Sequence, residues 1–198
     1  EDENIELIRS YFEIHGYKNN ETEYISYFGC DTIGSALVIG NYIKNLSSDS
    51  KIVIHRDKDY LDEETIQRIK EKVENKGFTF FTTKGVDIES NFIDSQHINC
   101  LYPELSIDHI NNLIDEATNE TERDSIDRIL KRYALKKESG IKLLDMYTEN
   151  KERYRYGKKV FSRLKGKIQP LIGENPNLLR ETEYLINNDL KLQTEIFE

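Results

Sequence analysis

The segment from Lys51 to Tyr60 constrains the fold more than any other part of the sequence. It reads Lys-Ile-Val-Ile-His-Arg-Asp-Lys-Asp-Tyr, so three consecutive β-forming residues run directly into two aspartates. An apolar run this short, without polar alternation, is typical of a central strand that is covered on both faces. We therefore expect an open α/β sheet around this strand, with ligands bound beyond the carboxyl ends of the strands.

Helix and strand patterns alternate along the first half of the chain. Helices are predicted over about residues 4–15, 31–46 and 62–76, and strands over residues 23–28, 52–54 and 78–83. This order predicts a Rossmann-like parallel sheet with helices on both faces. Beyond Cys100 only helical patterns remain, interrupted at Pro170 and Pro176. The predicted domains are an α/β core over residues 1–100 and a helical appendage over residues 101–198.

The charge of the chain is unevenly distributed. The net charge is −9, yet residues 128–167 contain 14 Lys or Arg against 4 Asp or Glu, a local balance of +10 that leaves −19 for the other residues. An acidic half and a basic half suit a metal-dependent enzyme that acts on a polyanion, because the metal offsets the acids while the bases hold phosphates. A solvated helix with charges of both signs around it is the commoner explanation of a charge run.

Carboxylates that follow predicted strands are candidate metal ligands. Asp57 and Asp59 are two residues apart, so in an extended segment they point the same way and can share one divalent cation. A polar loop after a strand would explain the pair equally well. The metal candidates are Glu1, Asp57, Asp59 and Glu89, with Asp2, Glu3 and Asp87 as neighbours that could substitute.

Cations interleaved with tyrosines occur in the basic half. The segment Tyr154-Arg-Tyr-Gly-Lys-Lys159 suits phosphate contact and base or sugar stacking, although an ordinary helix start would also explain it. We expect Lys158 or Lys159 to face the metals, because Gly157 allows close approach of the backbone. The predicted nucleic-acid contacts are Arg153, Arg155, Lys158, Lys159 and Arg163.

Several other classes of protein fit the sequence poorly. Cys30 and Cys100 are isolated and expected to be reduced, which fits a cytoplasmic protein. No apolar run is long enough to span a bilayer, so no membrane is expected, and the opening residues do not form a signal peptide. Phosphate-loop and dinucleotide-binding motifs are absent from the sequence. Because the sequence opens without Met, we expect it to be part of a longer protein.

Three motifs carry a resemblance to a known family: Glu1 before a helix, His-Arg-Asp-Lys-Asp at residues 55–59, and Thr-Thr-Lys-Gly-Val-Asp-Ile-Glu-Ser-Asn-Phe at residues 82–92. Together they resemble the TOPRIM fold of topoisomerases, primases and certain nucleases. The likeness is strongest to the TOPRIM domains that follow ABC-type ATPase domains in OLD-family (overcoming lysogenisation defect) endonucleases of bacteria and phage. That family also has a Lys in its helical part, which Gly157-Lys158 matches in kind. The first motif departs from the family pattern, since Glu1-Asp2-Glu3-Asn4 stands in place of Glu-Gly with an acid one turn later.

The resemblance implies a DNA endonuclease that uses two Mg²⁺ or Mn²⁺ ions. Asp57, Asp59 and Glu1 would bind one ion, Glu89 would bind the second or position water, and Lys158 would stabilise charge on the phosphate. The implied partners are DNA and an ATPase domain in the same or another chain, in anti-phage defence, and a homo-oligomer is left open. The alternatives are a non-catalytic TOPRIM-like regulatory or docking module and a receiver-like or phosphatase-like domain.

Overall fold

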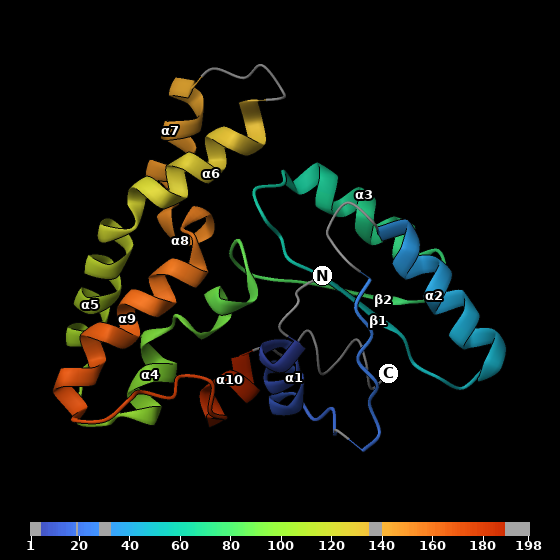
Figure 1. Cartoon of the computed structure of the whole chain (residues 1–198), viewed down its shortest axis with the longest axis horizontal. Coiled ribbons are helices and arrows are strands. Elements are labelled where there is room, and N and C mark those ends of the chain that lie inside the picture. The colour runs from blue at the N-terminus through green and yellow to red at the C-terminus, as the bar shows by residue number, and fades with distance from the viewer. Residues whose placement is uncertain (1–4, 19, 28–32, 135–139, 189–198) are drawn as a thin grey trace. The chain divides into compact units, whose positions relative to one another are not determined.

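Figure 1 shows the computed structural model, which describes residues 5–18, 20–27, 33–134 and 140–188. The chain forms a mixed α/β structure that is mostly helical. In chain order, its elements are α1 (Ile5–Ile14), α2 (Ile33–Leu46), β1 (Val53–Arg56), α3 (Glu63–Glu74), β2 (Thr79–Thr82), the 3-10 helix η2 (Ile88–Phe92), α4 (Ser95–Leu101), α5 (Ile107–Glu120), α6 (Glu122–Ala134), α7 (Gly140–Glu149), α8 (Lys151–Tyr154), α9 (Gly157–Ile172) and α10 (Glu183–Asn188).

Two compact units make up the described residues. The first contains the described part of residues 1–82 and 186–198, and the second contains the described part of residues 83–185. The sequence predicted a first domain that ends at residue 100. Residues 83–100 lie instead in the second unit, because Ile93 and Ile98 are buried in its apolar core together with residues of α5 and α9.

The sheet of the first unit consists of β1 and β2, which run parallel and side by side (Figure 1). Their register sets Val53 opposite Thr79 and Arg56 opposite Thr82. The predicted parallel pairing is therefore confirmed. Consecutive residues of a strand point to opposite faces of the sheet. Ile54 and His55 are both buried, so β1 is covered on both faces, as the apolar run predicted. Within the described residues, however, β1 pairs only with β2, so the expected central position in a larger sheet is not observed.

The predicted strand at residues 23–28 is wrong for the part that the structure describes. Residues 22–27 form no strand, and Phe28 lies outside the described residues. Tyr27 is buried in the core of this unit, and its hydroxyl donates a hydrogen bond of 2.8 Å to the backbone oxygen of His55. Aromatic residues favour strands because they suit half-buried surfaces, and here Tyr27 reaches such a surface from a non-strand segment.

Three predicted helices of the first unit are confirmed as α1, α2 and α3, and two of them have clear end signals. Asp62 begins α3 by accepting a hydrogen bond of 2.7 Å from the N–H of Thr65. Gly16, with φ of 89°, ends α1 in a Schellman motif, in which Gly16 N–H binds Glu13 O and Tyr17 N–H binds Phe12 O. Asp31 and Thr32, the predicted cap residues of α2, lie outside the described residues.

The second unit is helical, as predicted for the chain beyond Cys100, and its core lies between α5 and α9, which run alongside each other (Figure 1). Val160, Leu164 and Ile168 recur every four residues along α9 and are fully buried. The predicted helix break at Pro170 is wrong, because α9 continues to Ile172. A proline in the last turn removes only one hydrogen bond. None of the described helices is long and apolar enough to cross a lipid bilayer.

His97 joins distant parts of the second unit. The side chain is fully buried, with Nε2 2.7 Å from the backbone oxygen of Leu178 and Nδ1 2.9 Å from the hydroxyl of Thr182. A carbonyl only accepts, so Nε2 carries the proton and Nδ1 accepts from Thr182. Burial lowers the pKa of His97 below its ordinary value, and the neutral ring therefore holds the chain around residues 178–182 against α4.

Candidate functional site

The first predicted site residue that the structure describes is Asp57, directly beyond the carboxyl end of β1. Its side chain is buried, and Oδ1 lies 3.6 Å from Nε2 of His55, the residue two positions earlier. The His55 ring is tilted against Phe81 of β2, with 5.2 Å between ring centroids. The carboxylate of Asp57 therefore sits at the strand end in a largely water-excluded position, and protonation of His55 would make their contact an ion pair.

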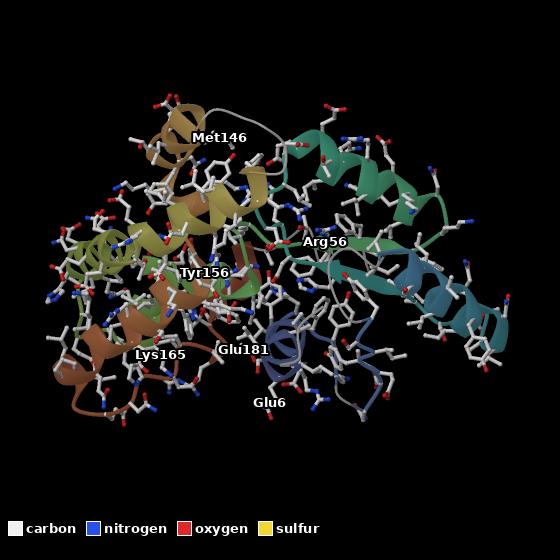
Figure 2. The ribbon with its side chains drawn as sticks, turned by 45° about the horizontal axis from the view of Figure 1, so that its top comes forward. Glu6, Arg56, Met146, Tyr156, Lys165 and Glu181 are labelled. Atoms are coloured by element: carbon white, nitrogen blue, oxygen red, sulfur yellow. The ribbon has the colours of Figure 1, made fainter. Side chains whose placement is uncertain are left out.

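Asp59 follows a different geometry from the one that the sequence predicted. Its φ is 49°, in the left-handed region, which non-glycine residues visit mainly in turns and at strained functional sites. The extended segment that would point Asp57 and Asp59 the same way is therefore interrupted. Oδ2 of Asp59 lies 3.7 Å from the guanidinium of Arg56, the buried last residue of β1, which Figure 2 labels. The two aspartates thus contact different side chains, His55 and Arg56.

The ligand set of the predicted metal site is not complete in the described structure. Among the described residues, no three His, Cys, Asp or Glu side chains are grouped so that they could hold a metal ion. Glu1 lies outside the described residues, and Glu89 belongs to the second unit, in η2. What the first unit offers is the pair Asp57 and Asp59, whose carboxylate oxygens are of the type that hard divalent cations prefer.

A second group of predicted residues lies where α9 begins. The buried carboxylate of Asp87 accepts a hydrogen bond of 3.0 Å from the backbone N–H of Lys158. The first N–H groups of a helix have no acceptor within the helix. Asp87, which lies 71 residues away in sequence, provides the acceptor for the N–H of Lys158. Gly157 makes this possible, because a Cβ atom there would lie 2.9 Å from Cγ of Asp87 and closer still to Oδ1. The sequence predicted close approach at Gly157, and the approaching group is a carboxylate.

Asp87 is also held by its own turn. The hydroxyl of Ser90 donates a hydrogen bond of 3.0 Å to Oδ1, next to Glu89 in η2. Burial raises the pKa of Asp87 above its ordinary value, while the hydrogen bonds from Lys158 and Ser90 act in the opposite direction. The start of α9, which carries Lys158, is thereby fixed to the segment that carries Glu89. Both residues were predicted to be catalytic, and this contact connects their elements within one unit.

One of the predicted nucleic-acid contacts is corrected by the structure. Arg155 is buried, and its guanidinium donates a hydrogen bond of 3.1 Å to the backbone oxygen of Ile93. Burial lowers the pKa of Arg155, and the carboxylates of Glu152 and Asp115 counteract this effect. A cation in this position stabilises the second unit from inside and cannot reach a DNA backbone at the surface.

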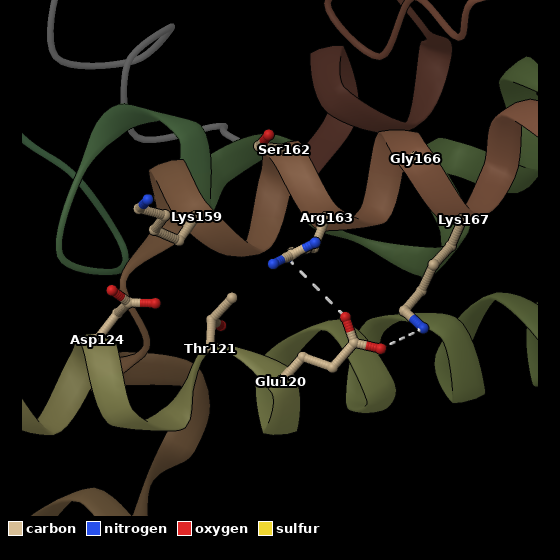
Figure 3. A pocket seen from close by; sticks show the side chains of 8 residues that line it. All are labelled: Glu120, Thr121, Asp124, Lys159, Ser162, Arg163, Gly166 and Lys167. Atoms are coloured by element: carbon tan, nitrogen blue, oxygen red, sulfur yellow. Dashed lines mark ion pairs between the residues drawn. The ribbon is translucent and has the colours of Figure 1, made fainter.

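Acidic side chains already contact the last cations of the basic segment, residues 128–167. Lys167 lies 2.9 Å from Glu116 and 2.7 Å from Glu120, and Arg163 lies 4.0 Å from Glu120. Glu120, Arg163 and Lys167 line a pocket of about 450 Å³ between α9 and the α5–α6 segment (Figure 3). The pairing with α5 could not be deduced from the sequence, because the partners are more than forty residues apart in the chain and nothing local marks them.

A stacked pair that the sequence did not single out joins α6 to the residue before α9. The guanidinium of Arg128, on α6, lies 3.7 Å from the centroid of the Tyr156 ring and donates a hydrogen bond of 2.7 Å to its hydroxyl. Arg153 lies 5.0 Å from the ring of Tyr154. The predicted interleaving of tyrosines and cations is therefore a set of cation–π contacts within the unit, with Lys159 exposed beside it.

No protein-family model matches the sequence, and no curated protein or solved structure is significantly similar to it. The likeness to the TOPRIM family therefore rests on the three short motifs and the lysine at position 158.

Proposed function

We propose that the chain is a divalent-metal-dependent DNA endonuclease domain. The observation that carries this proposal is the buried carboxylate of Asp57 immediately beyond β1 of a parallel sheet, with Asp59 in the turn that follows it. Carboxylates are costly to bury unless they are paired or bind a cation.

Asp57 and Asp59 would hold a Mg²⁺ or Mn²⁺ ion. Such an ion activates water and offsets charge on the phosphate that is cut. The participation of Glu1, Glu89 and Lys158 is proposed from the family resemblance alone, as is linkage to an ATPase domain in the same or another chain. The contact between Asp87 and Lys158 supports a fixed position of Lys158 with respect to η2, within the second unit.

The experiment compares a double variant, Asp57→Asn with Asp59→Asn, against Glu71→Gln, which changes an exposed acid on α3. Asparagine preserves the side-chain volume next to His55, so the fold is retained while the negative charge is removed. We expect the double variant to lose Mg²⁺- or Mn²⁺-dependent nicking of supercoiled plasmid and calorimetric Mn²⁺ binding. The Glu71→Gln protein should retain both.

Activity that survives the double substitution would refute the assignment. A wild-type protein that binds no Mn²⁺ and leaves plasmid intact would favour a non-catalytic TOPRIM-like docking or regulatory module. Hydrolysis of a small aryl phosphate, with plasmid unchanged, would favour a phosphatase-like domain.

A further inference from the structure

The pocket between α9 and the α5–α6 segment has a polarity that the proposed function does not explain. Its α9 wall presents three cations at four-residue spacing, Lys159, Arg163 and Lys167. Residues four apart lie about 6 Å from each other along a helix axis. The row therefore extends about 12 Å, long enough to follow more than one phosphate of a strand.

Small residues lie between these cations. Ser162 and Gly166 line the pocket on the same side of α9, and a Cβ atom at Gly166 would meet nothing within 4 Å. Figure 3 shows the side chains of Arg163 and Lys167 extending from α9 toward Glu120 on the opposite wall. The pocket therefore has open space over Gly166, where a polar chain could lie along the helix.

The opposite wall is acidic and already engages the row. Glu120, at the end of α5, lies 2.7 Å from Lys167 and 4.0 Å from Arg163, and Asp124 of α6 lines the pocket across from Lys159 (Figure 3). The side chain of Glu120 is 48% exposed, so water reaches this contact. Exposed ion pairs of this kind are weak and screened by salt, so the phosphates of a strand, which bring several negative charges in a row, can replace the single carboxylate.

We propose that the α9 row binds the phosphates of a nucleic-acid strand and that Glu120 is a built-in competitor for two of its three cations. This inference rests on the proposed function, since it concerns how the same domain holds its DNA. Glu120 occupies the position of a phosphate group while the pocket is empty of nucleic acid. Its carboxylate therefore lowers the affinity for a phosphate strand.

The test measures binding of a fluorescein-labelled single strand of about 20 nucleotides by fluorescence anisotropy, in the presence of EDTA. The salt concentration is varied between about 50 and about 200 mM, a range in which phosphate contacts strongly affect affinity. Removing one charge about 4 Å from a phosphate in water should tighten binding about fivefold, so Glu120→Gln is expected to do so. Arg163→Gln should weaken binding and reduce the slope of log K against log salt by about 0.7. The gain from Glu120→Gln should shrink when Arg163→Gln is also present.

Glu104→Gln is the matched control. It removes the same charge from an exposed site just before α5, while Glu120 ends that helix, about 20 Å away along its axis. Equal tightening by both variants would mean a general charge effect and would overturn the proposal. Absence of binding at about 50 mM salt, where charges are screened least, would overturn it as well. EDTA prevents cutting, so binding that follows these expectations in a protein without nuclease activity would separate the pocket from the proposed catalysis.

Discussion

Substitution of two glycines in the same helix should have opposite effects on stability. At Gly157, the first residue of α9, an added Cβ would lie 2.9 Å from Cγ of Asp87 and closer to its Oδ1. Overpacking of a buried site costs about 1–3 kcal/mol. Displacing the carboxylate from the N–H of Lys158 also breaks a hydrogen bond to a charged group, which is worth about 1.5–3 kcal/mol. Because Asp87 can relax in part, we expect Gly157→Ala to reduce the free energy of unfolding by about 3 kcal/mol.

Gly166→Ala provides the control on α9, since that position is exposed and a Cβ there meets nothing within 4 Å. Alanine is favoured over glycine within helices by about 0.5–1 kcal/mol, so this variant should be more stable than the wild type. Thermal unfolding followed by far-UV circular dichroism measures both effects. A loss of about 3 kcal/mol corresponds to a decrease in Tm of about 6–12 °C for a chain of this size.

A double-mutant cycle identifies the group responsible. If the clash with Asp87 is the cause, Gly157→Ala should cost at least about 1 kcal/mol less in an Asp87→Ala background. Equal stabilisation by the two glycine substitutions, or an unchanged cost in that background, would refute the description of Asp87 as the carboxylate packed over Gly157.

Three further measurements test other contacts. Because burial lowers the pKa of His97 below its ordinary value of 6.5, the unfolded chain binds a proton more readily near that pH, and urea denaturation should show stability present above about pH 6.5 and lost as the pH falls. His97→Gln should reduce this pH dependence, and an unchanged profile would show that another group causes it. Asp62→Ala should remove the N-cap of α3 and cost about 1 kcal/mol by the same assay, whereas no loss would mean that the cap bond is unimportant. Gly40→Ala places a Cβ 2.8 Å from the Phe78 ring and should cost about 1–3 kcal/mol in thermal unfolding, unless the ring moves aside freely.

Local patterns in the sequence determined the helices and the parallel pair of strands. The Asp62 cap, the glycine after α1 and the four-residue spacing of Val160 and Leu164 act through neighbours within a few positions, so their effects can be read without tertiary information. The apolar run before Asp57 likewise marked a buried strand. The strand predicted around Tyr27 was wrong because an aromatic residue gains burial equally well from a side-chain contact, and sequence pattern does not distinguish the two.

Tertiary structure alone decided which charged residues are available at the surface. Arg155 and Lys159 belong to the same basic segment, yet Arg155 is buried while Lys159 is exposed. Likewise, only the packing of α5 on α9 brings Glu120 to Lys167, and only the approach of Asp87 to Gly157 fixes the start of α9. Electrostatic contacts depend on distances between segments that lie far apart in the chain, and those distances follow from the packing of the whole core.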